Sequence, residues 1–534
     1  MFIITLVKNA MSKRERIAFL VAFIILIVSF IATGVFTVKE NSTYVPVSGG
    51  SYSEGIVGQP IMVNPILSKN QPDLDISALV YSPLSRLIAS SEVGEEGRVY
   101  TIKLKEGLVW DDNQTLTSDD IIFTIKTIQN PDSRSPLEKN WRGISAERVS
   151  ELQIVFKLPV PYSFFGQIMK NTPIIPRHIF SAIPVENFRL SSYSLRPVGS
   201  GPYMIKKIDQ RRDGFITEYQ LVPNPLYEGE APFISNFFFK FYESEDDLFK
   251  NFRLREVNGF GSLTPLRENF TSVGNIKLEK IPMSRYYAIF LNPINNPSLK
   301  DSKIRDALNL SIDKKELTKL FGENNAFPIN SPLVPLSKDD ENNFENKHNQ
   351  ETARNLLEKS KEKNLKINLI VPNTKTFKTI GEFIKNSWTG IGVQEVTVLP
   401  VDPDAIFDNA IKTRNYEAVL FGNVLENPID LFPFWHSSQR LSPGLNLSFY
   451  QNTAVDKLIE KIHQTKDDQE RKVLTQETSS LIEEDVPAIF LFTEPYFYIH
   501  SKKLEGMNIQ FISKPSDRFS NVANWSVVRA RVLK

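Results

Sequence analysis

The stretch "WDDNQTLTSDDIIFTIK", residues 110–126, places four aspartates and an asparagine within eleven residues and then turns apolar. A calcium loop of the EF-hand type needs a glycine at its sixth position and a glutamate at its twelfth. Counted from Asp111, those positions hold Leu116 and Ile122. The count from the next aspartate fails in the same way, so the stretch is not a calcium loop of this type.

A turn followed by a helix start accounts for the same residues. Asn113 belongs to the residue types that tolerate a left-handed backbone in turns. Thr117 is suited to cap a helix, with Asp120 three residues later as the acid of a capping box. Isoleucines at 121, 122, 125 and 128 then recur at helical spacing. We therefore expect these aspartates to serve structure and not catalysis.

Composition limits the function classes. With 534 residues the chain is too long for one compact core, so two or three domains are expected. Its net charge of +1 gives no electrostatic reason to bind nucleic acid. The sequence contains no cysteine. Disulfides, thiolate metal sites, thiol nucleophiles and a lipidated N-terminal cysteine are therefore excluded.

The N-terminal region contains a candidate membrane segment. Residues 17–36 carry no charge, and twenty helical residues at ~1.5 Å each cross a hydrocarbon core of ~30 Å. Four basic residues precede the segment and little charge follows it. The excess of positive charge places residues 1–16 in the cytoplasm and the large remainder outside the cell or in the periplasm.

A cleaved signal peptide is the alternative interpretation of this segment. The apolar part of a signal peptide is usually only ~7–15 residues long, which favours an uncleaved anchor over residues 17–38. The polar residues 39–50 are typical of a flexible tether. Met11 is an alternative start of the protein.

The second half of the chain alternates strands with helices. Strands are expected at 365–371, 396–401 and 416–422, with helices at 376–389 and 403–413 between them. This alternation indicates an α/β lobe with a mainly parallel sheet.

The sequence lacks the common motifs for catalysis and for metal binding. Five histidines are present, and none pairs with another at metal-ligand spacing. The sequence has no nucleophile elbow of the G-x-S-x-G type, no P-loop and no dinucleotide-binding glycine pattern. We therefore expect no enzyme activity, no cofactor and no metal site.

Several segments, taken in order, resemble the family 5 extracellular solute-binding proteins of ABC importers, the oligopeptide- and dipeptide-binding group. The resemblance covers roughly residues 52 to 515, and Asn113 stands where the family usually has glycine. The segments that carry it are "YTIKLKEGLVWDDNQTLTSDDIIFTIKTI" (100–128), "RPVGSGPYMIKKI" (196–208), "LVPNPLYEGEAPFISNFFFKF" (221–241), "LNPINNPSLKDSKIRDALNLSIDKKEL" (291–317) and "TARNLLEKS" (352–360).

The resemblance implies a fold and its boundaries. The family has two α/β lobes joined by a hinge, with an extra subdomain inserted in the first lobe, so this is the fold class we expect after the single transmembrane helix. Carried over, the first lobe takes residues 51–90, 195–285 and 486–534. The inserted subdomain takes residues 91–194, and the second lobe takes residues 286–485.

The resemblance also implies a function. The chain would be the membrane-anchored, monomeric receptor of an ABC importer that captures peptides or a similar small solute and delivers them to permease and ATPase subunits. It would use no cofactor. The alternatives are a binding protein for an oligosaccharide or a metal chelate, and a secreted enzyme or structural surface protein on the same fold.

Residues expected in the ligand cleft follow from the matched segments. The segment "NPILSKNQPD" (64–73) resembles a ligand-contacting segment of the family. A surface loop and buried core positions remain alternative interpretations of these residues. The residues indicated by the matches are Lys69, Asn70 and Gln71 in the first lobe, Phe421 on a second-lobe strand, and Phe492 and Tyr496 where the chain returns to the first lobe.

The expected ligand type depends on one departure from the family. Peptide binders commonly carry an aspartate four residues before the proline of the second-lobe loop, where it pairs with the peptide ammonium. Here that proline corresponds to Pro428, and Val424 stands four residues before it. A buried ammonium without a counter-charge is costly. Glu426 and Asp430 lie close in sequence, and either could supply the missing charge.

Overall fold

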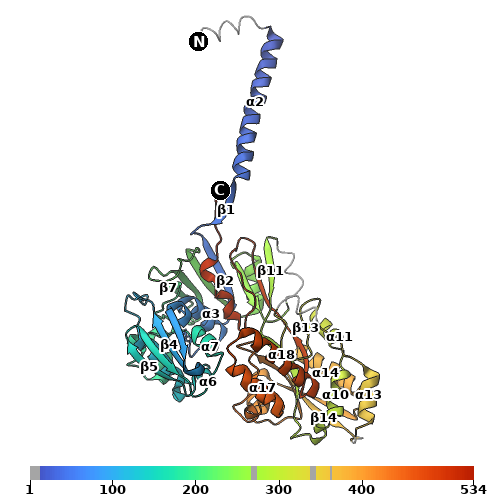
Figure 1. The fold of residues 1–534 in the computed structure, drawn as a ribbon. Coiled ribbons are helices and arrows are strands. Elements are labelled where there is room, and N and C mark those ends of the chain that lie inside the picture. The colour runs from blue at the N-terminus through green and yellow to red at the C-terminus, as the bar shows by residue number, and fades with distance from the viewer. Residues whose placement is uncertain (1–11, 266–273, 337–343, 361, 363, 534) are drawn as a thin grey trace.

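The structure is a computed structural model that describes residues 12–265, 274–336, 344–360, 362 and 364–533. The alternative start at Met11 lies outside the described residues. Figure 1 shows one long helix projecting from a body that contains two lobes.

The long helix is α2, Lys13–Glu40, and it has the length and composition of a membrane span. Ser12 and Glu15 form a capping box at its start. The apolar side chains along it are exposed, so no part of the body covers them. The helix contains the whole segment expected as an anchor, residues 17–38.

The segment expected as a flexible tether is mostly ordered. Helix α2 continues to Glu40, and strand β1 (Ser42–Pro46) follows almost at once. Strand β1 pairs antiparallel with the C-terminal strand β19 (Arg529–Leu533), with Ser42 opposite Leu533. The expectation of a flexible tether over 39–50 was wrong, because its hydrogen-bonding partner lies at the far end of the sequence.

A seven-stranded sheet forms the first lobe, in the order β11-β18-β10-β2-β9-β8-β7. Tyr52 of this sheet packs against Phe237 on the neighbouring strand and against Trp525 from the C-terminal region. The strands are β2 (Ser51–Val57), β7 (Tyr203–Gln210), β8 (Ile216–Pro223), β9 (Asn236–Tyr242), β10 (Gly259–Ser262), β11 (Ile276–Ile281) and β18 (Tyr496–Ser501), and the main helices are α3 (Gln71–Val80) and α9 (Glu245–Arg253).

The insert is a four-stranded antiparallel sheet with five α-helices, and it lies between α3 and β7 in the sequence. Its strands run in the order β3-β4-β6-β5. The elements are β3 (Ile88–Gly94), β4 (Val99–Leu104), β5 (Ser145–Ser150), β6 (Gln153–Lys157), α4 (Leu84–Leu87), α5 (Ser118–Gln129), α6 (Glu138–Trp141), α7 (Phe165–Asn171) and α8 (Arg177–Phe180).

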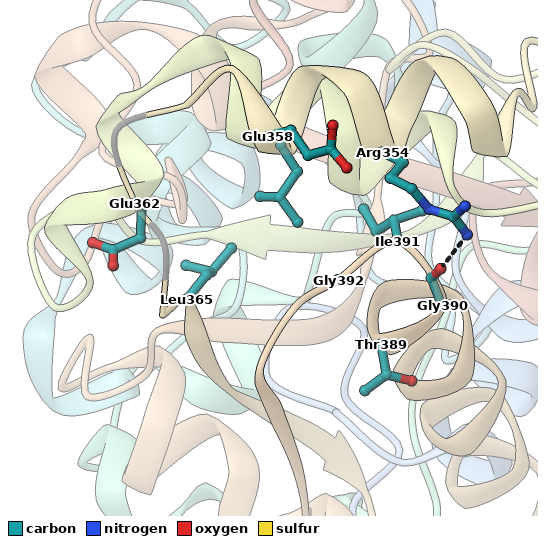
Figure 2. Close-up of a pocket in the computed structure, with 9 residues that line it drawn as sticks. Arg354, Glu358, Glu362, Leu365, Thr389, Gly390, Ile391 and Gly392 are labelled. Atoms are coloured by element: carbon teal, nitrogen blue, oxygen red, sulfur yellow. Dashed lines mark hydrogen bonds between the residues drawn. The ribbon is translucent and has the colours of Figure 1, made fainter.

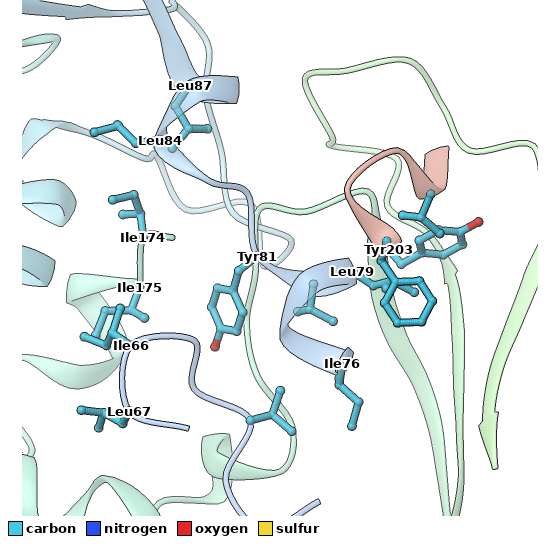
Figure 3. Close-up of a cluster of buried hydrophobic side chains, with 14 of the residues drawn as sticks. Ile66, Leu67, Ile76, Leu79, Tyr81, Leu84, Leu87, Ile174, Ile175 and Tyr203 are labelled. Atoms are coloured by element: carbon cyan, nitrogen blue, oxygen red, sulfur yellow. The ribbon is translucent and has the colours of Figure 1, made fainter. Parts of the chain in front are cut away.

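The insert shares one apolar core with the first lobe. Figure 3 shows Ile174 and Ile175 of the insert on one side of Tyr81, with Leu79 and Tyr203 of the first lobe on the other. Because packed interiors transmit strain between their parts, the insert and the first lobe are expected to move together.

The aspartate-rich stretch forms the predicted turn and helix cap. Asn113 has φ of 66°, and Thr117 caps α5 with Asp120 completing the capping box. Asp120 also accepts the backbone N–H of Arg177 at 2.8 Å. Burial raises the pKa of Asp111 to about 6, although that carboxylate accepts the backbone N–H of Gly199 at 3.1 Å. These aspartates therefore fasten segments of the chain to one another.

A six-stranded sheet forms the second lobe, in the order β13-β17-β12-β16-β14-β15. The pairs β14–β15 and β14–β16 are parallel, but the other three neighbouring pairs are antiparallel. The expectation of a mainly parallel sheet was therefore wrong. The strands are β12 (Arg285–Leu291), β13 (Phe327–Pro328), β14 (Lys366–Pro372), β15 (Glu395–Val401), β16 (Ala418–Val424) and β17 (Ala488–Thr493).

Helices cover both faces of this sheet, and each face has its own apolar core. One core contains Trp388 of α14, and the other contains Trp435 of α16. The helices are α10 (Ser302–Leu310), α11 (Lys314–Thr318), α13 (Gln350–Glu358), α14 (Lys375–Gly390), α15 (Pro403–Ile406), α16 (Phe432–Trp435), α17 (Thr453–Gln464) and α18 (Asp468–Asp485).

Candidate functional site

The chain crosses between the two large sheets at two places. It leaves the first sheet after β11 and enters the second at β12, through residues 282–284. It returns between β17 and β18, through residues 494–495. Because β17 belongs to the second sheet, the return lies after Thr493 and not near residue 486. Two crossovers side by side are the arrangement of a hinge.

The crossovers bring two buried, opposite charges together. Arg285 begins β12 and Glu494 follows β17 directly, and their side chains are 10% and 7% exposed. Arg285 Nη2 and Glu494 Oε2 are 3.4 Å apart. The Thr493 hydroxyl donates to the backbone carbonyl of Arg285 at 2.6 Å, which holds the two strand ends together. We call Arg285 and Glu494 the junction pair.

The junction pair lies on an aromatic stack. The Arg285 guanidinium is 5.2 Å from the centre of the Tyr287 ring, and Tyr287 stacks on Phe492 at 5.0 Å. The Tyr287 ring also packs closely against Gly422. A Cβ at residue 422 would lie only 2.8 Å from that ring, so no larger residue fits there without a shift. A guanidinium above an aromatic ring is attracted to the face of that ring.

The pKa of Glu494 shows how strongly this region is desolvated. Burial raises the pKa of Glu494 to about 7, and the nearby Arg285 opposes that rise without cancelling it. The separation of 3.4 Å between Arg285 Nη2 and Glu494 Oε2 makes this a loose ion pair.

A second region joins the insert to the second lobe. The Tyr162 hydroxyl donates to Asp430 Oδ2 at 2.7 Å, and His463 Nε2 lies 3.0 Å from Asp430 Oδ1. Phe164 is 3% exposed and packs with Ile462 and Leu474 of the second lobe. We call this region, formed by Tyr162, Phe164, Asp430 and His463, the interlobe contact.

The first-lobe residues expected to touch ligand have different surroundings. Lys69 is exposed. Asn70 caps α3 by accepting the backbone N–H of Asp73 at 3.1 Å. Gln71 donates to Asp75 at 2.5 Å. Asn70 and Gln71 thus have structural contacts, and a ligand role for all three remains a prediction.

Asp75 belongs to a fully buried ion network inside the first lobe. Arg518 donates to Asp75 Oδ2 at 2.7 Å and to Glu54 Oε1 at 2.8 Å. All three side chains are at most 2% exposed. The network joins β2, α3 and the C-terminal region, so Gln71 contributes indirectly to the stability of this lobe.

The second-lobe residues divide between the two faces of β16. Phe421 lies opposite Ala288 and packs in the core on one face. Val424 lies opposite Arg285 on the other face and is 45% exposed. Phe492 and Tyr496 are 0% and 3% exposed, so both are interior residues of the described structure. Their contact with ligand also remains a prediction.

The two acids expected to hold an ammonium have partners already. Glu426 is exposed, and its Oε2 accepts a hydrogen bond from the side-chain amide of Asn140 at 2.8 Å. Asp430 is 8% exposed, and both of its oxygens are engaged in the interlobe contact. Asp430 therefore offers no unoccupied carboxylate oxygen in this conformation, whereas the exposed Glu426 gives one of its two oxygens to Asn140.

Sequence reasoning missed Arg285, Glu494, Tyr162 and His463. One signal could have found Glu494, because it is the single charge within the run "AIFLFTEPYFYI", residues 488–499. The other partners lie far away in sequence, and no local spacing links them.

Two hollows on the surface lie away from the junction pair. One, of about 310 Å³, is lined by Arg354, Glu358 and Gly390 among others. Figure 2 shows the hydrogen bond that Arg354 donates to the Gly390 carbonyl. The other, of about 400 Å³, lies beside Gln129 and Arg142 in the insert. Neither is lined by a residue expected to bind ligand. Within the described ranges, no group of three or more histidines and acids could hold a metal ion.

Comparisons with known proteins give a consistent result. The oligopeptide-binding protein AppA of Bacillus subtilis (strain 168) is 22% identical over 560 residues, covering 96% of this chain and 99% of that protein. The nickel-binding protein NikA of Staphylococcus aureus is 23% identical over 401 residues, covering 73% of this chain and 76% of that protein.

A solved structure shows the same fold. The ABC transporter substrate binding protein CtaP from Listeria monocytogenes superposes with a TM-score of 0.77 at 24% identity, covering 90% of this chain and 100% of that one. The sequence pattern described as "Bacterial extracellular solute-binding proteins, family 5 Middle" matches residues 83–440, which is more than half of the chain. The chain therefore belongs to the bacterial extracellular solute-binding proteins of family 5.

Proposed function

We propose that this chain is the membrane-anchored receptor of an ABC importer and that it captures peptides between its two lobes. The observation that carries the proposal is the hinge-like junction, where two adjacent crossovers join two separate sheets. A ligand that touches both lobes only when they are closed shifts the population towards the closed form. Such a receptor needs no cofactor and carries out no covalent chemistry.

Peptides are the proposed ligand because most of the similar proteins are named for binding peptides. Similar proteins are named for binding oligopeptides, dipeptides and glutathione, while another is named for nickel. Peptide ligands account for most of these names. The relative named for oligopeptides also matches almost the whole of this chain.

The proposed cleft has two walls. The first lobe and its insert form one wall, and the end of the second sheet that holds Arg285 and Val424 forms the other. Lys69 and Val424 are the exposed members of the expected site and would meet the ligand directly. The remaining expected residues (Asn70, Gln71, Phe421, Glu426, Asp430, Phe492 and Tyr496) would shape and support the walls.

Helix α2 would anchor the receptor with the large domain outside the cytoplasm. Basic residues precede its apolar run, which favours a cytoplasmic N-terminus. Anchoring keeps the receptor at high effective concentration near the permease and ATPase subunits that it would serve as a monomer.

Native mass spectrometry of the full-length chain in lipid nanodiscs tests the proposal. Protein isolated without harsh washing should release peptides, and added peptide should restore the mass of the complex. The released compound should be chemically unchanged after incubation. Binding of a non-peptide solute in preference to every peptide offered, or conversion of the bound compound, would contradict the proposal.

A further inference from the structure

Three neighbouring strands of the second lobe end side by side at the junction. Strand β16 ends at Val424, β12 begins at Arg285, and Glu494 follows the last residue of β17. Strand β12 lies between β16 and β17, and Val424 is directly opposite Arg285 in the antiparallel pair. Residues directly opposite each other point to the same face of a sheet, so Arg285 and Val424 are side-chain neighbours.

Arg285 has unused hydrogen-bonding capacity. Among the described residues its Nε–H is buried and has no acceptor, and the hydroxyl of the adjacent Ser284 is also buried without a partner. Nη2 donates to Glu494 at the long distance of 3.4 Å. A buried donor without an acceptor is costly and is uncommon in native proteins.

Arg518 of the first lobe provides a comparison within the same chain. It is also buried, but it is paired with two carboxylates at 2.7 Å and 2.8 Å, and its Nε donates to Glu54 at 3.2 Å. Arg285 has one carboxylate, held loosely. One further anionic group at Arg285 would give it the arrangement that Arg518 already has.

The surroundings favour an anion over a cation at this place. Val424 brings no charge, and its exposed side chain connects the Arg285 face to solvent. The acids Glu426 and Asp430 are engaged with Asn140, Tyr162 and His463. An ammonium placed over Val424 would therefore lie beside the Arg285 guanidinium, which would repel it.

We propose that Arg285 selects the ligand by binding an anionic group of the solute, a carboxylate in the case of a peptide, through its free Nε–H. This inference rests on the proposed function, because it specifies the chemistry of the solute in the same cleft. The solute reaches Arg285 across Val424 when the lobes separate. The Tyr287 ring keeps the guanidinium in place, so little side-chain freedom is lost on binding.

The experiment uses the full-length chain in lipid nanodiscs and a thermal-shift screen followed by calorimetry. The library contains short peptides, amino acids, organic acids and sugars, each acid matched with its amide or neutral counterpart. Alanine tripeptides are included free, N-acetylated, C-amidated and blocked at both ends. The variants are Arg285→Gln, which removes the charge, and Arg285→Lys, which keeps it.

Arg354→Gln is the matched control. It removes the same charge from the second lobe, but Arg354 lies at the outer hollow and donates to the Gly390 carbonyl. This variant should bind every ligand as the unaltered chain does. It separates the loss of one positive charge from the loss of the guanidinium at the junction.

Ligands of the unaltered chain should carry an anionic group, and neutralising that group should weaken binding roughly 10- to 100-fold. N-acetylation should have little effect. Arg285→Gln should weaken binding of the anionic ligand to a similar degree and abolish the difference between the acid and its amide. Arg285→Lys should retain part of that difference.

Two results separate this inference from the proposed function. If anionic non-peptides bind and peptides do not, the peptide assignment fails while the role of Arg285 stands. If peptides bind equally well with a free or an amidated carboxyl terminus, the role of Arg285 fails while the peptide assignment stands. A library without any ligand for the unaltered chain would count against both.

Discussion

Replacing Phe164 with alanine should open the two lobes. Phe164 comes from the insert, yet it is buried among Ile462 and Leu474 of the second lobe. Arg471 lies 5.4 Å from the centre of its ring. Burying a phenylalanine removes ~150–250 Å² from water, which at ~25 cal/mol per Å² would stabilise the closed form by about 4–6 kcal/mol if the whole side chain were exposed on opening.

The expected shift follows from that magnitude. Part of the Phe164 side chain stays covered in the open form, so Phe164→Ala should remove about 2–4 kcal/mol of the stabilisation of the closed form. This loss corresponds to roughly a 30- to 900-fold change in the closed-to-open ratio. The chain has no cysteine, so Val149→Cys in the insert and Val473→Cys in α18 give two labels for energy transfer. Both side chains are exposed.

The control is Phe180→Ala, which removes an equally buried ring from the insert without touching the second lobe. Phe180→Ala should lower the melting temperature and leave the label distance unchanged. Phe164→Ala should lengthen the label distance and weaken ligand binding. Unchanged distance and unchanged affinity in Phe164→Ala would show that the interlobe contact does not hold the lobes together.

Three further outcomes are expected. The pKa of Glu494 in the folded chain is raised by burial to about 7 from its ordinary value of 4.5. The stability of the unaltered chain relative to Glu494→Gln should therefore fall by up to roughly 3 kcal/mol between pH 4.5 and 7, as thermal melts at both pH values would show, and a pH-independent difference would contradict this. Thr117→Ala should lower the free energy of unfolding by about 1 kcal/mol, because it removes the side-chain cap of α5. Chemical denaturation would measure this loss, and the control Thr117→Ser, which keeps the hydroxyl, should be nearly neutral. Equal losses in the two variants would exclude the cap as the cause. Protease added to intact cells should digest the large domain and leave a fragment containing α2 in the membrane, whereas a soluble protein beginning near residue 35 would show that the segment is cleaved.

Features that depend on neighbouring residues could be predicted from the sequence. The turn at Asn113, the cap at Thr117 and the isoleucine face of α5 all appear as expected, because caps and helical faces are set within a few residues. The order of matched segments likewise indicated two lobes with an insert. Strand direction in the second sheet could not be predicted, because it depends on which distant strands lie next to β12.

The contacts of the candidate site were even harder to predict from the sequence. Arg285 and Glu494 are 209 residues apart, and Tyr162 and Asp430 are 268 residues apart. No periodicity or spacing rule connects groups at such separations. The expected acid Asp430 is near the right region, but only its contacts reveal that Tyr162 and His463 occupy both carboxylate oxygens.

The pairing of β1 with β19 has a consequence for how the protein is made. Ser42 pairs with Leu533, so the strand beside α2 has no partner until the chain has been translated through residues 529–533. A product that stops before β19 therefore keeps β1 without this partner next to α2, where a protease could reach it. A tag joined directly after β19 would begin beside β1 and so close to the end of α2.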